Sequence, residues 1–338
     1  MLGIINATEN FPSLQQVTNH RSVAALPFGG RYRLIDFMLS NMVNSHIHSV
    51  AIFTSHKNRS LMDHLGSGKQ WDLDRKRDGL FLFPPNCQCA QDEFGSFAHF
   101  SRHIDYFLRS KQEYVVITNS HVVTALDFQS VLERHLYTNA HITEVCHRGQ
   151  SLQTYILKKE LLLHLFETYQ ETGYYSLLDI VKEKRNTSLR MESYEHTGYV
   201  AVIDSIESYY KHSLEILQPH IWKQLFKKEA PIFTKVKDEP PTRYGKEASV
   251  HNAMIANGSI IEGEVESSVV FRSVKIGKGS IVRNSVIMQK SQIGENCILD
   301  GVILDKDVKI EDGTILTDAS DPVVVEKGKT QSSNVTIH

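Results

Sequence analysis

The chain has 338 residues, a formal net charge of −2, 41% hydrophobic residues and 22% charged residues, a composition typical of a globular protein. It has no long basic run, which disfavours non-specific nucleic-acid binding, and no apolar stretch reaches the roughly 20 residues that span a bilayer. The first ten residues lack the basic and apolar regions of a signal peptide. We therefore expect a cytoplasmic protein with neither nucleic acid nor membrane as a partner.

Short β-branched runs alternate with amphipathic patterns along the first two thirds of the chain. Buried strands are predicted at 2–6, 49–55 and 113–119. Helical spacing of apolar residues predicts helices over 35–45, 94–110, 158–169 and 205–218. This alternation predicts an α/β domain, residues 1–234, whose mostly parallel sheet is covered on both faces.

A second domain with another periodicity is predicted after a linker. Residues 235–247 are charged and contain two consecutive prolines, which is typical of a linker. Beyond it, apolar residues recur at a step of 17, as in the series Val269, Val286, Ile303. A fixed step of this kind indicates stacked coils. We predict a left-handed parallel β-helix of the hexapeptide type over 248–338, with its repeats visible to 317 and a β-sandwich as the alternative. Its apolar flank should pack on another part of the protein.

The cysteines and histidines do not form a clear metal-ligand pattern. Two cysteines are close together but lack the spacing of a zinc site; the four are Cys87, Cys89, Cys146 and Cys297. Reduced thiols are expected. Two histidine pairs lack cysteine or carboxylate clusters beside them, which favours core or solvated roles; they are His46/His48 and His99/His103.

One stretch, LPFGGRYRLIDFMLSN (26–41), places two glycines beside a basic cluster and ahead of an apolar helix. Gly29 and Gly30 fit a tight turn into a helix that begins near Ile35. The neighbouring Arg31 and Arg33 suggest that the stretch holds an anion.

Three strings in the chain carry a resemblance to a known family. PFGGRYRLIDFMLSN (27–41), Asn44-Ser45 and GSGKQWDLDR (66–75) are closely similar to strings of the ADP-glucose pyrophosphorylases (glucose-1-phosphate adenylyltransferases). The resemblance implies a Rossmann-like, GT-A-like nucleotidyltransferase domain followed by a left-handed β-helix. It also implies a link to bacterial glycogen synthesis, in which that family converts ATP and glucose 1-phosphate into ADP-glucose and pyrophosphate.

Adenylyl transfer needs a glycine-rich loop, cations for the triphosphate and carboxylates for Mg²⁺. The family's first loop is rich in glycine and contains an arginine. Here the matching residues, 6–14, contain neither glycine nor a basic residue. Glu9 in this loop would repel a phosphate.

The other catalytic positions that the resemblance implies are also altered. Val23 stands where the family has a phosphate-contacting lysine, and Ala98 stands where it has an aspartate. Ser120 and Val202 stand where it has two metal-binding aspartates. Each change should remove several kcal/mol of transition-state stabilisation, so we expect no catalytic residue and no metal in this chain.

With these losses the chain is similar to the non-catalytic, regulatory (GlgD-type) subunits of the family. That resemblance implies a heterotetramer with a catalytic subunit, or self-association, with Mg²⁺ used by the catalytic partner and no cofactor bound by this chain. Arg21 and Arg33 match arginines of the family's anionic effector site, whereas its lysine position is Ser49. The alternative is a structural role for these arginines at helix ends or beside carboxylates such as Asp36.

Three other functions stay open. A weakly active nucleotidyltransferase would use other metal ligands, such as Asp204 or Asp127. A hexapeptide-repeat acyltransferase would need a catalytic histidine in the β-helix, where the chain has only His251 and His338. A small-molecule sensor would form a homo-oligomer without affinity for a catalytic homologue.

Overall fold

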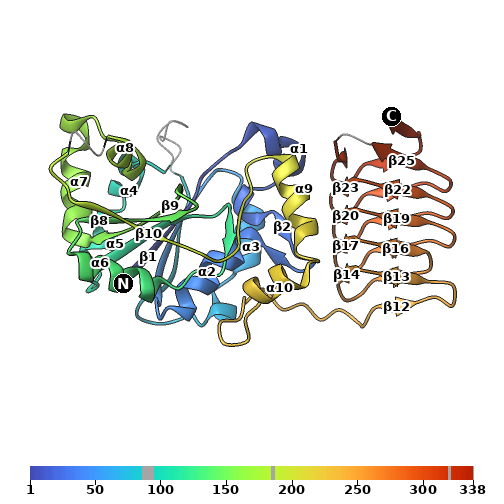
Figure 1. The fold of residues 1–338 in the computed structure, drawn as a ribbon, viewed down its shortest axis with the longest axis horizontal. Helices are drawn as coiled ribbons and strands as arrows, with labels where there is room; N and C mark the ends of the chain where they lie inside the picture. The colour runs from blue at the N-terminus through green and yellow to red at the C-terminus, as the bar shows by residue number, and fades with distance from the viewer. Residues whose placement is uncertain (86–94, 184–186, 319–320, 338) are drawn as a thin grey trace.

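The computed structural model describes residues 1–85, 95–183, 187–318 and 321–337 (Figure 1). The first domain is built on a seven-stranded sheet of order β10-β8-β9-β6-β1-β4-β5. Strand β9 (Gln150–Lys158) runs antiparallel to both its neighbours, and the other pairs are parallel. The remaining strands are β1 (Leu2–Ala7), β4 (Ser49–Thr54), β5 (Gly79–Phe83), β6 (Tyr114–Asn119), β8 (Ile142–His147) and β10 (Met191–Glu195). The mostly parallel sheet and its three predicted strands are confirmed.

Helices cover both faces of this sheet because successive side chains of a strand point to opposite sides. Ile5 of β1 lies in the core formed with α2 (Leu34–Asn44) and α6 (Phe128–Thr138). Ile4 lies in the opposite core, whose helices are α4 (Phe97–Ser101), α5 (Ile104–Arg109), α7 (Lys159–Thr172) and α8 (Leu177–Lys182). The prediction of a single helix over 94–110 is wrong. The chain leaves helical geometry at His103 (φ −113°, ψ 30°), which separates α4 from α5.

Shorter elements complete the first domain near its junction with the second. Strands β7 (Val122–Thr124) and β11 (Val200–Val202) form an antiparallel pair, as do β2 (Pro27–Phe28) and β3 (Tyr32–Arg33). The helices here are α1 (Gln15–Thr18), α3 (Arg59–Leu65), α9 (Ile206–Glu215) and α10 (Pro219–Leu225), with a 3-10 turn η2 (Val23–Ala25).

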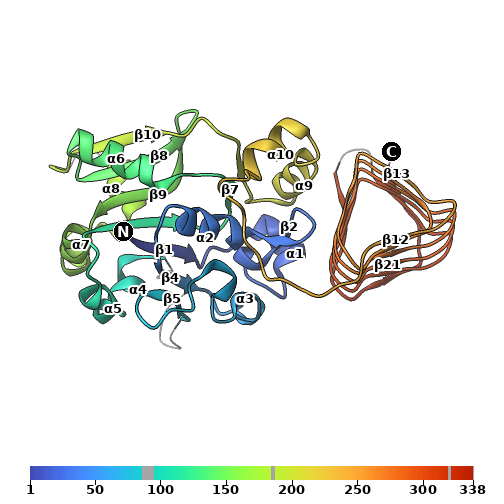
Figure 2. The same cartoon turned by 90° about the horizontal axis from the view of Figure 1, so that it is seen from below.

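The second domain is a left-handed parallel β-helix with three sheets and a triangular cross-section (Figure 2). One sheet contains β12 (Arg243–Tyr244), β15 (Ile260–Ile261), β18 (Lys275–Ile276), β21 (Gln292–Ile293), β24 (Lys309–Ile310) and β27 (Thr330–Gln331). Another contains β13 (Ser249–His251), β16 (Glu264–Glu266), β19 (Ile281–Arg283), β22 (Ile298–Asp300), β25 (Ile315–Asp318) and β28 (Val335–Ile337). The third contains β14 (Met254–Ile255), β17 (Val269–Val270), β20 (Val286–Ile287), β23 (Val302–Leu304) and β26 (Val323–Val325).

The predicted step of 17 is the register of the central coils, where Val269 pairs with Val286 and Val286 pairs with Ile303. The predicted boundaries need correction at the start. Strand β12 lies inside the segment predicted as a linker and pairs with β15, so the β-helix begins before residue 248. At the other end, β26, β27 and β28 extend the coils through most of the segment after residue 317.

The β-helix buries its apolar flank against the first domain, as predicted. Val269, Val286 and Ile303 point out of the coils and share a core with Tyr209 of α9 and with Phe28. Their immediate neighbours in the strands point inward and fill the coil interior; these are Val270, Ile287 and Leu304. Each of these strands thus has two apolar faces: one fills the coil interior, and the other lies in a hydrophobic core that the two domains share.

The described cysteines, and His99 of the two histidine pairs, are buried. Cys146 and Cys297 are buried and not disulfide-bonded, while Cys87 and Cys89 lie outside the described residues. His99 packs edge-on against Phe53, with ring centroids 5.2 Å apart. Within the described ranges, no group of three or more His, Cys, Asp or Glu side chains is arranged to hold a metal, and no helix is long and apolar enough to cross a membrane.

Candidate functional site

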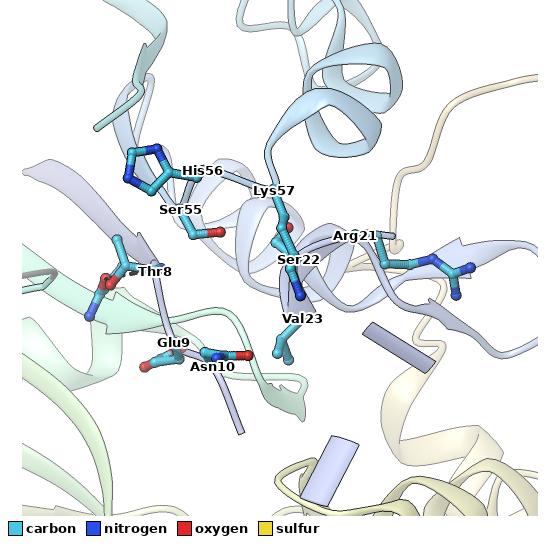
Figure 3. Close-up of a pocket in the computed structure, with 10 residues that line it drawn as sticks. Thr8, Glu9, Asn10, Arg21, Ser22, Val23, Ser55, His56 and Lys57 are labelled. Atoms are coloured by element: carbon cyan, nitrogen blue, oxygen red, sulfur yellow. Dashed lines mark hydrogen bonds between the residues drawn. The ribbon is translucent and has the colours of Figure 1, made fainter. Parts of the chain in front are cut away.

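A cleft of about 400 Å³ opens at the carboxyl ends of β1 and β4 (Figure 3). Ligands of open α/β sheets bind at this end of the strands. The lining residues come from the loop after β1, the start of η2 and the loop after β4; they are Asn6, Thr8, Glu9, Asn10, Arg21, Ser22, Val23, Ser55, His56 and Lys57. Val23 is therefore in the cleft, where it presents an apolar side chain in place of a lysine.

The structure brings together the two positions expected from the family's metal ligands. Strand β11 pairs with β7, so that Val202 lies opposite Val122. The Ile203 N–H donates to the His121 carbonyl at 2.9 Å, next to the buried Ser120. Ser120 and Val202 are thus diagonal neighbours, two residues apart in register, near the end of the central strand. Neither carries a carboxylate that could hold Mg²⁺.

An ion pair spans this region. Nδ1 of His121 lies 3.0 Å from Oε2 of Glu9, and both side chains are largely buried. Burial alone would lower the pKa of His121, but the charge and hydrogen bond of Glu9, aided by Asp204, outweigh it and raise the pKa above its usual value. The sequence predicts repulsion of phosphate by Glu9. It gives no signal for the partner, which is 112 residues away.

Neither of the two alternative metal ligands is assembled into a metal site. Asp204 lies just before α9, where its backbone N–H donates to Ser208 Oγ at 3.1 Å. Asp127 is the N-cap of α6, and its carboxylate accepts the N–H groups of Gln129 and Ser130. Although burial acts in the other direction, the hydrogen bonds from Ser130 and Gln129 lower the pKa of Asp127. Its role is to cap the helix.

Ala98 occupies the second position of α4 and offers only a methyl group. The helix begins at Ser96, whose hydroxyl accepts the His99 N–H. This segment is ordered by a helix cap and core packing, and it brings no carboxylate toward the cleft.

Arg21 links the two domains. Its guanidinium turns away from the cleft (Figure 3) and donates to both carboxylate oxygens of Asp305 in the β-helix, at 2.7 and 2.9 Å. Only 3% of Arg21 is exposed. These contacts support a structural role for Arg21, the alternative to a place in an anionic effector site.

Arg33 contributes both to structure and to a second cavity. Its backbone N–H donates to Asp36 Oδ2 at 2.9 Å, and its Nη1 donates to the carbonyl and hydroxyl of Ser60 at 2.6 and 3.0 Å. Burial lowers the pKa of Arg33 to about 10. Ser49, the position matched to the family's effector-site lysine, lies at the start of β4 with its hydroxyl 3.3 Å from Tyr106 OH. This is the end of β4 opposite the loop that lines the cleft.

The second cavity, of about 200 Å³, lies between the domains and is strongly basic. Its seven cationic side chains come from the first domain, the connecting segment and the β-helix, and are accompanied by one carboxylate, Asp307; the cations are Arg31, Arg33, Lys235, Lys237, Arg272, Lys290 and Lys306. Burial, followed by the charges of Arg33 and Arg21, lowers the pKa of Lys306 to about 7. We call this site the basic cavity. Sequence reasoning identified only its two arginines at 31 and 33, although the KVK string at 235–237 was a usable signal.

Gly29 and Gly30 form the turn between β2 and β3, both with positive φ (57° and 76°). A Cβ on Gly30 would lie 3.2 Å from Met254 Sδ in the first coil of the β-helix. The glycines predicted to shape a turn therefore also allow the β-helix to approach closely, and Arg31, which follows them, lines the basic cavity.

Comparison with known proteins agrees with this architecture. Residues 13–154 match the nucleotidyl transferase family, and residues 239–322 match the GlmU-like, C-terminal hexapeptide family. The glycogen biosynthesis protein GlgD of Bacillus subtilis (strain 168) is 54% identical over 333 residues, covering 98% of this chain and 97% of that protein. The chain belongs to the GlgD family. GlgD of Geobacillus stearothermophilus is 56% identical over 284 residues, covering 83% of this chain and 82% of that protein.

The GlgD family has more distant relatives among the enzymes that the sequence resembles. Glucose-1-phosphate adenylyltransferase of Bacillus anthracis is 26% identical over 357 residues, covering 94% of this chain and 95% of that enzyme. The resemblance to this family is thus confirmed, and membership of the GlgD family places the chain in glycogen biosynthesis.

Proposed function

We propose that this chain is a regulatory, catalytically inactive subunit of glucose-1-phosphate adenylyltransferase in bacterial glycogen biosynthesis, and that it works in the cytoplasm. In this proposal it binds no cofactor, and the Mg²⁺ of the reaction belongs to a catalytic homologue. The two chains form a heterotetramer. Preferential binding to the active conformation of the catalytic chain raises its activity or alters its response to effectors.

One observation carries the proposal: Ser120 and Val202, which lie on neighbouring strands and two residues apart in register, both lack a metal-binding carboxylate. Phosphoryl and adenylyl transfer depend on electrostatic stabilisation of the transferring group. A cleft without these carboxylates, and with Val23 in its wall, lacks the groups that hold and neutralise a triphosphate.

The test is co-expression of this chain with the catalytic homologue from the same organism. We expect the two to purify as one complex whose pyrophosphate release, from ATP, glucose 1-phosphate and Mg²⁺, differs in kcat or KM from that of the catalytic chain alone. A Ser120→Ala variant of this chain should leave the kinetics of the complex unchanged, because Ser120 does no chemistry here. Failure to form a complex, with unchanged kinetics of the mixture, would refute the regulatory role and favour a sensor that assembles with itself.

We further propose that the basic cavity binds a small polyanionic effector, such as a phosphate- or sulfate-bearing molecule. The support is the excess of cations over carboxylates in the cavity and the lowered pKa values of Lys306, Lys237 and Arg272, each caused first by burial and then by neighbouring positive charge. An anion bound there would relieve that repulsion. Because its cations come from both domains, ligand binding would also reinforce the contact between them.

This second proposal predicts a charge-specific loss of binding. Arg272→Gln should weaken the binding of inorganic phosphate or sulfate to the full chain by about tenfold or more, as expected for a charge-assisted hydrogen bond. Lys278→Gln removes the same charge from an exposed position of the β-helix outside this cavity and serves as the control. Equal affinities of the two variants, measured by titration calorimetry, would contradict the assignment.

A further inference from the structure

The loop after β1 is fastened across the mouth of the cleft by three contacts with distant parts of the chain. Glu9 pairs with His121 at 3.0 Å. Phe11 packs edge-on against the same imidazole, with ring centroids 4.9 Å apart. Ser13 Oγ donates to the Asp204 carbonyl at 3.0 Å. Together the contacts join the loop to the ends of β6 and β11.

The position of Glu9 affects which ligands can enter the cleft. It lines the cleft and also an adjoining cavity of about 190 Å³ that reaches Asn119 and Tyr155. Among the described residues that line either space, Glu9 is the one carboxylate. A fixed negative charge at the junction of two confined spaces repels an incoming phosphate, and low local dielectric strengthens that repulsion.

Two cations that line the cleft make contacts within the chain. Arg21 is held by Asp305, and Lys57 Nζ donates to the Thr18 carbonyl at 3.2 Å. The imidazole of His121 is the group at the end of the central strand that could receive an anion, and Glu9 occupies it.

We propose that Glu9 acts as an internal anion: its carboxylate takes the place of a phosphate-bearing ligand on His121, closes the loop after β1, and excludes external phosphates from the cleft. This inference goes beyond the proposed regulatory role, because it concerns what the cleft admits rather than what the chain does to a partner. Loss of catalytic residues explains why bound nucleotide would not react. The internal anion explains why phosphate groups would not bind in the first place.

The experiment follows the His121 ring in the full chain by NMR while inorganic tripolyphosphate is added to millimolar concentration. A His121→Asn variant assigns the resonance. In the unmodified chain, and in a Glu229→Gln control that removes an exposed carboxylate, the His121 signals should stay fixed. In Glu9→Gln, at a pH at which His121 is protonated, they should shift and saturate, since the imidazolium is released and the repelling charge is gone.

Two results would overturn the proposal. One is an equal shift of the His121 signals in the unmodified chain and in Glu9→Gln; the other is no shift in Glu9→Gln, which would mean that something other than Glu9 excludes phosphate. Glu9→Asp keeps the charge and should keep the signals fixed, so the comparison survives if Glu9→Gln folds poorly. None of these measurements involves the catalytic homologue. They therefore test the role of Glu9 independently of the proposed regulatory function.

Discussion

The cleft at the ends of the strands and the basic cavity between the domains differ in electrostatic character. The cleft presents Val23, is lined by Glu9 and Lys57, and directs Arg21 away toward the β-helix. The basic cavity collects seven cationic side chains around one carboxylate. In one chain, therefore, the site expected to handle a triphosphate offers few cations, while the junction of the domains gathers many.

This contrast shows how an enzyme fold can be preserved without its chemistry. Folding depends on the cores and on the domain interface, which use apolar residues from both halves of the chain. Apart from Arg21, which pairs with Asp305 between the domains, the polar residues of the cleft lie outside those cores. A cluster of like charges costs stability, which supports the proposal that an anionic ligand binds in the basic cavity.

The largest expected effect comes from the ion pair between Arg21 and Asp305, which joins the two domains. Arg21→Ala should lower the free energy of unfolding by about 3–5 kcal/mol, since it leaves Asp305 buried without its partner. The measurement is urea denaturation. The double variant Arg21→Ala/Asp305→Ala should lose less than the sum of the two single variants. Arg283→Ala breaks a pair with Glu264 that is exposed and should change little; a similar loss in both arginine variants would contradict a special role for the interdomain pair.

The glycine turn tests how closely the domains must approach. Gly30→Ala should cost roughly 2–3 kcal/mol, because alanine is strained at positive φ and its Cβ would press on Met254. Gly173→Ala is a matched control with φ of 74° and no atom within 4 Å of the added Cβ. The difference between the two variants in thermal or urea unfolding isolates the domain contact, and no difference would show that this contact does not constrain the turn.

The cleft can be tested through pH. Because the pKa of His121 is raised in the folded state, the pair with Glu9 stabilises the fold fully below the unfolded pKa of about 6.5 and progressively less as pH rises through the folded value. Glu9→Gln should therefore cost about 2 kcal/mol near pH 6, in the range of a charged hydrogen bond, and less at pH 9. Unfolding curves of both proteins across this range provide the check. A cost that is independent of pH would mean that the ion pair is not formed.

Sequence reasoning predicted the parts of the molecule whose signals are local. The β-branched runs predicted β1, β4 and β6, and the step of 17 predicted the central register of the β-helix. Sequence reasoning missed the break at His103, because apolar residues with helical spacing continue on both sides of it. It placed the start of the β-helix too late, because β12 has only two residues and both are exposed.

The site was predictable only where single positions decide its chemistry. The missing carboxylates at Ser120 and Val202 are visible in the sequence once the resemblance is recognised, and their proximity follows from the pairing of β7 with β11. The pairs Arg21–Asp305 and Glu9–His121 join residues 284 and 112 positions apart. The basic cavity needs three segments to meet. No local pattern contains that information, since it arises from the tertiary fold.

The most direct test of the central claim is turnover by this chain alone. The purified chain, at a concentration well above that used for a catalytic homologue, is mixed with ATP, glucose 1-phosphate and Mg²⁺, and pyrophosphate is measured over a long incubation beside an Asp204→Ala variant. We predict no pyrophosphate above the uncatalysed background from either protein. Substantial release by the unmodified chain that Asp204→Ala abolishes would contradict the account, because it would show that the cleft assembles a metal site from the carboxylate that remains.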